Sequence, residues 1–198
     1  MANNTKKLIH GVGINNLPYP IKHCPFYERW RSMLCRCYSS KFHLNNTSYE
    51  NCYVCEEWKY ALNFKTWMEK QEWQGKVLDK DIIFPGNKIY SPETCIFVPV
   101  EINLLVVKNK KNRIYPLGVY KSSTNKKFDS KIRINGKSLF LGSYYTLIEA
   151  HREWQKFRIY YLKKVASQQI DDRLKDALIN IANRVESDYI AGVETKYT

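Results

Sequence analysis

The pair Asn135-Gly136 constrains the fold of this chain more than any other short feature. It joins the end of one run of nearly alternating apolar and polar residues, 127–135, to a second run, 138–141. An Asn-Gly pair in this setting is the strongest short-range signal for a β-hairpin, because both residues tolerate the positive φ angles of a two-residue turn. The sequence therefore predicts two antiparallel strands that meet at this turn.

The residues around this hairpin predict a three-stranded antiparallel sheet packed on a helix. A third strand is expected at residues 117–120. A long helix is expected to begin at Thr146, because Glu149 follows three residues later and the two can form a capping box. A final amphipathic helix is expected at residues 171–187, where apolar residues recur at three- and four-residue spacing.

The strand at residues 127–135 has two chemically different faces. Side chains alternate across a strand, so Ile132 and Ile134 share one face while Lys131 and Arg133 share the other. The first face is suited to packing on the helix, and the second to contact with a polyanion. A sheet ribbon of this size fits the major groove of DNA.

The distribution of charge points to the same partner. The net charge is +13, and the segment from Lys108 to Lys137 contains ten basic residues and a single acidic residue, Asp129. A basic excess concentrated in this way is typical of nucleic-acid binding, so we expect double-stranded DNA as the partner. Membrane binding is not expected, because the basic residues follow a strand pattern and no apolar run approaches the roughly 18 residues of a membrane span.

The N-terminal half predicts a second small unit. Helical periodicity covers residues 24–38 and 56–73, with a short strand at residues 49–55 between them. Farther along the chain, residues 108–113 form a polar, charged run without hydrophobic periodicity, which we expect to be a linker.

The predicted fold class is α+β, with one domain at residues 1–111 and a second at residues 112–198. The first is expected to hold a helical region and a strand–strand–helix core, and the second the three-stranded sheet. The N-terminus has no apolar signal core, which predicts a cytoplasmic protein.

Six cysteines in a cytoplasmic chain argue against a disulfide framework. The spacing of Cys52 and Cys55 fits a zinc knuckle. The side chains that could complete such a site are Cys24, Cys35, Cys37 and His43. The alternative to a structural Zn²⁺ site is that these thiols are buried as small hydrophobic groups.

Polar residues in the predicted core follow a strand–loop–strand–helix order. Asp79 ends the first strand, Gly86-Asn87 lies in the loop, and Asn103 lies on a short helix after the second strand. This order brings an acid and an amide within reach of one divalent ion. The segment, with Thr94 nine residues before Asn103, resembles the ββα-metal core of HNH endonucleases of the phage-encoded, homing type.

This resemblance implies metal-dependent hydrolysis of a phosphodiester. Asp79 and Asn103 would be the ligands of Mg²⁺ or Mn²⁺, and Thr94 would take the position of an Asn that holds the loop and orients the base. Lys80 stands where the family usually carries a His as general base. The residues implied in catalysis are Asp79, Lys80, Asp81, Thr94 and Asn103.

The lysine at the position of the base leaves three alternatives open. Asp81 could act as the base or as a second metal ligand. A histidine from elsewhere, namely His10, His23 or His43, could fold into the site. In the third alternative the core is inactive and serves as a scaffold in which Lys80 holds a phosphate.

Residues 115–165 resemble the DNA-binding domain of the APETALA2/ethylene-response-factor type. The resemblance rests on Gly118-Val119-Tyr120, on the hairpin region, and on Glu149-Ala150. It implies a sheet in the major groove with the helix behind it, while lysines at the strand ends reach phosphates. The expected DNA-binding residues are Tyr120, Lys121, Ser122, Lys126, Lys127, Lys131, Arg133, Lys137, Ser138 and Phe140.

Together these patterns predict a phage-type, HNH-like DNA endonuclease with a sheet domain that positions the DNA. One metal core cuts one strand, so a monomer would nick and a homodimer could cut both strands. The alternative is a catalytically inactive DNA-binding protein that regulates or inhibits a DNA-processing system.

Overall fold

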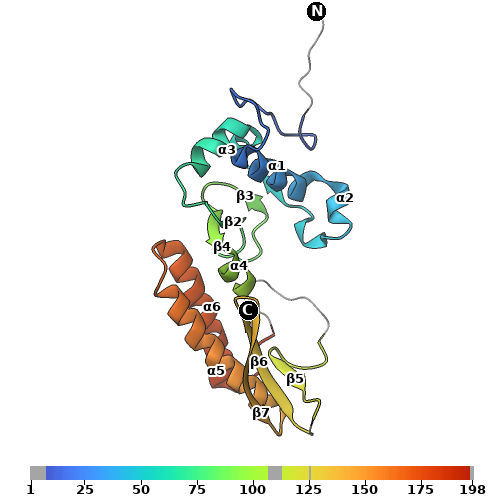
Figure 1. Cartoon of the computed structure of the whole chain (residues 1–198), viewed down its shortest axis with the longest axis vertical. Helices are drawn as coiled ribbons and strands as arrows, with labels where there is room; N and C mark the ends of the chain where they lie inside the picture. The colour runs from blue at the N-terminus through green and yellow to red at the C-terminus, as the bar shows by residue number, and fades with distance from the viewer. Residues whose placement is uncertain (1–7, 107–112, 125, 197–198) are drawn as a thin grey trace, which may run out of the picture. The chain divides into compact units, whose positions relative to one another are not determined.

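The computed structural model describes residues 8–106, 113–124 and 126–196 (Figure 1). The protein combines α-helices with short β-sheets and divides into two compact units, Met1–Pro99 and Val100–Thr198, each with its own hydrophobic core. The expected linker at residues 108–113 lies almost wholly outside the described residues, and so does the expected domain boundary after residue 111.

The first unit is built from short helices and two small pairs of strands. β1 and β3 pair in parallel, whereas β2 and β4 pair antiparallel. Its elements, in chain order, are α1 (Pro25–Tyr38), α2 (Ser40–His43), η1 (Thr47–Tyr49), β1 (Tyr53–Val54), η2 (Glu57–Lys59), α3 (Ala61–Met68), β2 (Lys76–Asp79), β3 (Ile89–Tyr90) and β4 (Ile96–Pro99).

Helix α1 supplies the centre of the first core. Its apolar residues recur at three- and four-residue spacing, so that Trp30, Met33 and Leu34 lie on one buried face. The indole Nε1 of Trp30 donates a buried hydrogen bond of 2.7 Å to the carbonyl oxygen of Trp58. This bond gives the one polar atom of the ring a partner and ties α1 to the chain segment before α3.

The helix predicted at residues 56–73 is interrupted. Tyr60 is extended, with φ −97° and ψ 122°, and α3 begins only after it. The reason is a backbone bridge from the N-terminal segment: Ile14 pairs with Tyr60, and its carbonyl oxygen accepts a bond of 3.0 Å from the N–H of Ala61. The strand predicted at residues 49–55 is likewise reduced to β1.

The second unit is a three-stranded antiparallel sheet with two long helices. The strand order is β5-β6-β7, α5 packs on the sheet, and α6 packs along α5 (Figure 1). No helix in the described residues has the length and apolar character needed to cross a membrane. The elements are α4 (Val100–Val106), β5 (Val119–Lys121), β6 (Phe128–Ile134), β7 (Lys137–Tyr144), α5 (Leu147–Ala166) and α6 (Asp172–Ala191).

The hairpin between β6 and β7 turns where the sequence predicts. Asn135 and Gly136 have φ angles of 49° and 76°, and the flanking Ile134 and Lys137 are paired. The pairing is irregular farther along: Lys131 pairs with Phe140, but the preceding residue of β6 pairs with Gly142. Strand β7 therefore carries one extra residue, Leu141, in a β-bulge.

The inner face of the sheet packs on α5 through Ile132 and Trp154, and the bulged Leu141 joins this cluster. Gly118 allows the close approach of β5, since a Cβ at this position would overlap the ring of Trp154, and its φ of 77° also favours glycine. The predicted capping box of α5 is present: Thr146 Oγ1 accepts from the N–H of Glu149, and the Glu149 carboxylate accepts from the N–H of Thr146.

A buried histidine attaches the C-terminal segment to α5. Nδ1 of His151 lies 2.9 Å from the carbonyl oxygen of Leu117, and Nε2 accepts a bond of 3.0 Å from the N–H of Thr195. Thr195 Oγ1 in turn donates to Asp188 and accepts from Gln155. Because Nε2 is an acceptor, the ring must be neutral, with its proton on Nδ1.

This arrangement predicts a loss of stability in mild acid. Burial lowers the pKa of His151 below its ordinary value of 6.5, so the unfolded chain binds a proton at a higher pH than the folded protein does. The free energy of unfolding should therefore fall as the pH drops from about 7.5 to about 5.5. Urea unfolding at both pH values should show a weaker pH dependence for His151→Gln than for the unmodified protein. Equal dependence in the two would contradict this account.

Candidate functional site

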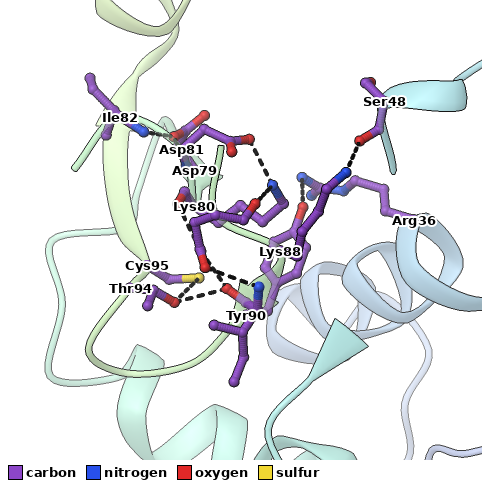
Figure 2. A network of polar contacts seen from close by, with 12 residues as sticks. Arg36, Ser48, Asp79, Lys80, Asp81, Ile82, Lys88, Tyr90, Thr94 and Cys95 are labelled. Carbon is purple, nitrogen blue, oxygen red and sulfur yellow. Dashed lines mark hydrogen bonds and ion pairs between the residues drawn. The ribbon is translucent and has the colours of Figure 1, made fainter. Parts of the chain in front are cut away.

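The side chain of Lys80, immediately after β2, is buried within the first unit. Only 4% of its surface is exposed, and its Nζ donates to the carbonyl oxygen of Asn87 at 2.6 Å and to Oδ2 of Asp81 at 2.8 Å (Figure 2). The ammonium also lies 5.8 Å from the centre of the Tyr90 ring. Burying an ammonium group costs several kcal/mol unless it is paired, and these contacts supply the pairing.

Asn87 closes the loop that begins at Lys80. Its Nδ2 donates to the carbonyl oxygens of Lys80 and Ile89, at 3.0 and 2.6 Å, and its Oδ1 accepts from the N–H of Ile89. Thr94 supports the same segment, because its Oγ1 donates to the carbonyl oxygen of Ile89 at 2.9 Å and accepts from the N–H of Ser91. The loop between β2 and β3 is thus held at both ends by side-chain contacts to its backbone.

The carboxylate of Asp79 caps a turn. Its Oδ1 accepts hydrogen bonds from the N–H groups of Asp81 and Ile82, at 2.8 and 2.7 Å (Figure 2). Burial raises the pKa of Asp79, while the two N–H groups act in the opposite direction. Oδ2 has no hydrogen bond or ion pair in the part of the chain that the structure describes.

The residues predicted for catalysis are only partly brought together. Asp79, Lys80, Asp81 and Thr94 gather around one loop of the first unit. Asn103 belongs to α4 of the second unit, where its Oδ1 is buried without a hydrogen-bond partner among the described residues.

None of the three histidines considered as the base, His10, His23 and His43, is hydrogen-bonded to Asp79 or Asp81 in the described residues. Nε2 of His43 lies 2.7 Å from the carbonyl oxygen of Arg36, and His23 is exposed.

Hard divalent cations prefer oxygen ligands. Oδ2 of Asp79 and Oδ1 of Asn103 are oxygens that accept no hydrogen bond from any described group. No cluster of three or more histidine, cysteine or acidic side chains able to hold a metal occurs in the described ranges. The cysteines predicted as zinc ligands are free thiols, and Cys24, Cys37 and Cys52 among them are buried.

The outer face of the β5–β6–β7 sheet holds five of the ten predicted DNA-binding side chains, those of Tyr120, Lys131, Arg133, Ser138 and Phe140. Tyr120 and Phe140 are 46% and 56% exposed, and Arg133 and Ser138 are paired across β6 and β7 and both exposed. Nε of Arg133 donates a hydrogen bond of 3.1 Å to the carbonyl oxygen of Gly136, and its side chain makes no other hydrogen bond in the described ranges. This guanidinium has no acidic partner there.

Lys131, on the same outer face, is paired with an acidic side chain. Its Nζ lies 2.9 Å from Oδ2 of Asp129 and 5.8 Å from the centre of the Tyr120 ring. The Asp129 carboxylate also accepts a hydrogen bond of 2.6 Å from the hydroxyl of Ser143. This bond and the contact with Lys131 both lower the pKa of Asp129. Asp129 and Ser143 were not predicted as site residues, although the alternation along β6 places Asp129 beside Lys131.

The remaining predicted residues surround the sheet face. Lys121, Lys126 and Lys137 are exposed, Lys121 and Lys137 at strand ends and Lys126 in the β5–β6 connection. Nζ of Lys127 lies 4.4 Å from the centre of the Tyr145 ring. Ser122 is half-buried just past the end of β5, where its N–H donates to the carbonyl oxygen of Lys127.

Comparison with known proteins finds no relative. The chain matches no family model, no curated protein and no solved structure. The function is therefore argued from the residues themselves.

The turn capped by Asp79 can be tested by stability. Asp79→Ala removes the acceptor of two backbone N–H groups, one of them on the buried Ile82, and should lower the free energy of unfolding by about 1–2 kcal/mol. Asp79→Asn keeps an Oδ1 acceptor and removes the half-buried charge, so its loss should be smaller. Chemical denaturation measures both variants. Equal losses would show that the charge of Asp79, and not the turn, supports this segment.

Proposed function

We propose that this protein binds double-stranded DNA through the outer face of the β5–β6–β7 sheet. The observation that carries the proposal is a single exposed face with Tyr120, Arg133 and Phe140, on a sheet whose other side is covered by α5. An arginine can donate two hydrogen bonds to the major-groove edge of guanine, and aromatic rings can contact the thymine methyl group.

The flanking lysines supply the sequence-independent part of this binding. Lys121, Lys126 and Lys137 have the exposure and the position at the margins of the sheet that phosphate contacts require. Lys131 is expected to contribute less, because Asp129 already neutralises its charge. In this proposal Arg133 is the main reader of base edges.

Two substitutions separate base recognition from phosphate contact. Arg133→Ala should relax the preference at one base pair by about 1–3 kcal/mol. Lys126→Ala should weaken binding to all duplexes alike and reduce the slope of log affinity against log salt by about 0.9. Fluorescence anisotropy over a salt series, with duplexes selected from a random pool, measures both effects. Identical behaviour of the two variants would contradict the proposed docking of the sheet.

We propose as a second candidate that the chain also nicks DNA in a metal-dependent reaction of the HNH type. The observation that favours it is the order of elements: Asp79 ends β2, β2 pairs antiparallel with β4, and α4 with Asn103 follows β4 directly. A divalent ion held at the Asp79 carboxylate would stabilise the charge that develops at the phosphate.

The contacts of Lys80 bear on this candidate in two ways. Its ammonium is committed to Asn87 and Asp81, and a charged amine cannot accept the proton of an attacking water. Asp81 is exposed, and its carboxylate could accept that proton. The ion pair with Lys80 fixes this carboxylate in the loop between β2 and β3.

A plasmid-nicking assay with Mg²⁺ or Mn²⁺ tests the second candidate. Asp79→Asn should abolish nicking and leave DNA binding nearly unchanged, because the ion acts on charge that develops in the transition state and the sheet does the binding. Lys80→His should increase nicking, since imidazole can serve as a general base. If neither the parent protein nor Lys80→His cuts DNA with either metal ion, while both remain folded and bind DNA, the chain is a DNA-binding protein without nuclease activity.

A further inference from the structure

A pocket of about 480 Å³ lies on the face of α1 that the first core does not use. Trp30, Met33 and Leu34 point into the core, whereas Arg31, Cys35 and Arg36 line the pocket from the other side of the helix. The rest of the wall comes from three other segments, through His10, Phe42 and Tyr49. All of these residues belong to the first unit, so the pocket and the sheet proposed to bind DNA have no residue in common.

The pocket is lined by cations without a carboxylate. Arg31 and Arg36 contribute two guanidinium groups, His10 adds a ring nitrogen, and no acidic side chain lies in the wall. Arg31 is exposed and makes no ion pair among the described residues. A concave surface with several donors and no negative charge is suited to an anion, and arginine favours phosphate because its donors match two phosphate oxygens.

Arg36 also contacts Leu78 and Tyr90. Its Nη1 lies 3.4 Å from the carbonyl oxygen of Leu78. The same nitrogen lies 3.4 Å from the hydroxyl of Tyr90, and the guanidinium lies 5.8 Å from the centre of the Tyr90 ring (Figure 2). A guanidinium fixed in this way loses little rotational freedom when it binds a ligand.

Two aromatic rings complete the wall. Phe42 and Tyr49 pack edge to face, with ring centres 5.5 Å apart, and both are half-buried. An aromatic ring beside a cationic site offers a stacking surface for a nucleobase, which typically contributes about 1–3 kcal/mol in binding of single strands. The volume lies within the range of about 300–1,000 Å³ that is usual for small-ligand sites.

We propose that this pocket binds one nucleotide, with the phosphate at Arg31 and Arg36 and the base against Phe42 or Tyr49. The nucleotide can be free in solution or belong to an unpaired part of a DNA strand, since both present the same phosphate and base. The proposal does not depend on the sheet, because it concerns residues of the first unit alone.

Calorimetric titration of the full chain with dAMP, deoxyadenosine, inorganic phosphate and a short oligo(dT) tests the pocket. We expect dAMP to bind about 10- to 100-fold more tightly than deoxyadenosine, because a charge-assisted phosphate contact is lost in the nucleoside. Arg31→Ala should reduce dAMP binding by a similar factor, whereas Arg29→Ala, on the same helix but outside the pocket wall, should not. If oligo(dT) binds more tightly than dAMP and depends on Arg31, the source is a DNA strand; the reverse order indicates a free nucleotide.

The rate at which Cys35 is alkylated reports whether a ligand occupies the pocket itself. It is a half-buried free thiol in the pocket wall, and Cys55 is a half-buried free thiol outside it. Bound dAMP should slow alkylation of Cys35 and leave Cys55 unchanged when both are followed by mass spectrometry. Equal binding of dAMP and deoxyadenosine, an unaffected Arg31→Ala variant, or unchanged alkylation of Cys35 would each overturn the proposal. The sheet variant Arg133→Ala should bind dAMP normally, so failure of the pocket and failure of the sheet are distinguishable.

Discussion

A buried ammonium group, that of Lys80, organises the loop between β2 and β3 of the first unit. The amine of Lys80 cannot leave its contacts with Asn87 and Asp81 without becoming an unpaired buried charge, so the loop between β2 and β3 has one low-energy arrangement. The turn capped by Asp79 lies at the start of the same loop. Lys80 thus has a structural role in this loop.

The second unit depends on a different constraint, the separation of the two faces of a thin sheet. The inner face is committed to α5 through Ile132 and Trp154, so Lys131 and Arg133, which alternate with Ile132, face outward. On that outer face Asp129 forms an ion pair with Lys131. Arg133 has no acidic partner in the described ranges. Selectivity among bases would then rest on few groups, with the surrounding lysines adding affinity alone.

Local signals in the sequence predicted the local structure well. The turn at Asn135 and the cap at Thr146 follow from residues within three positions of each other, and the structure contains both. Contacts between distant residues were not predictable in this way. Lys80 lies between two acids, a pattern typical of a solvated strand end, and its burial depends on Asn87, seven residues later. The predicted nuclease, metal and DNA contacts stay predictions, because they concern partners and not the fold of the chain.

The extra residue in β7 has a consequence for any comparison of this sheet with another. Leu141 and Gly142 are consecutive, yet Leu141 packs in the inner cluster and Gly142 is paired with the fully buried Ser130. Positions after Leu141 are therefore shifted by one relative to a regular strand, so that Ser143 again shares a face with Asp129. An alignment of β7 with an unbulged strand needs a gap here. Without that gap, every residue beyond Leu141 would be assigned to the wrong face of the sheet.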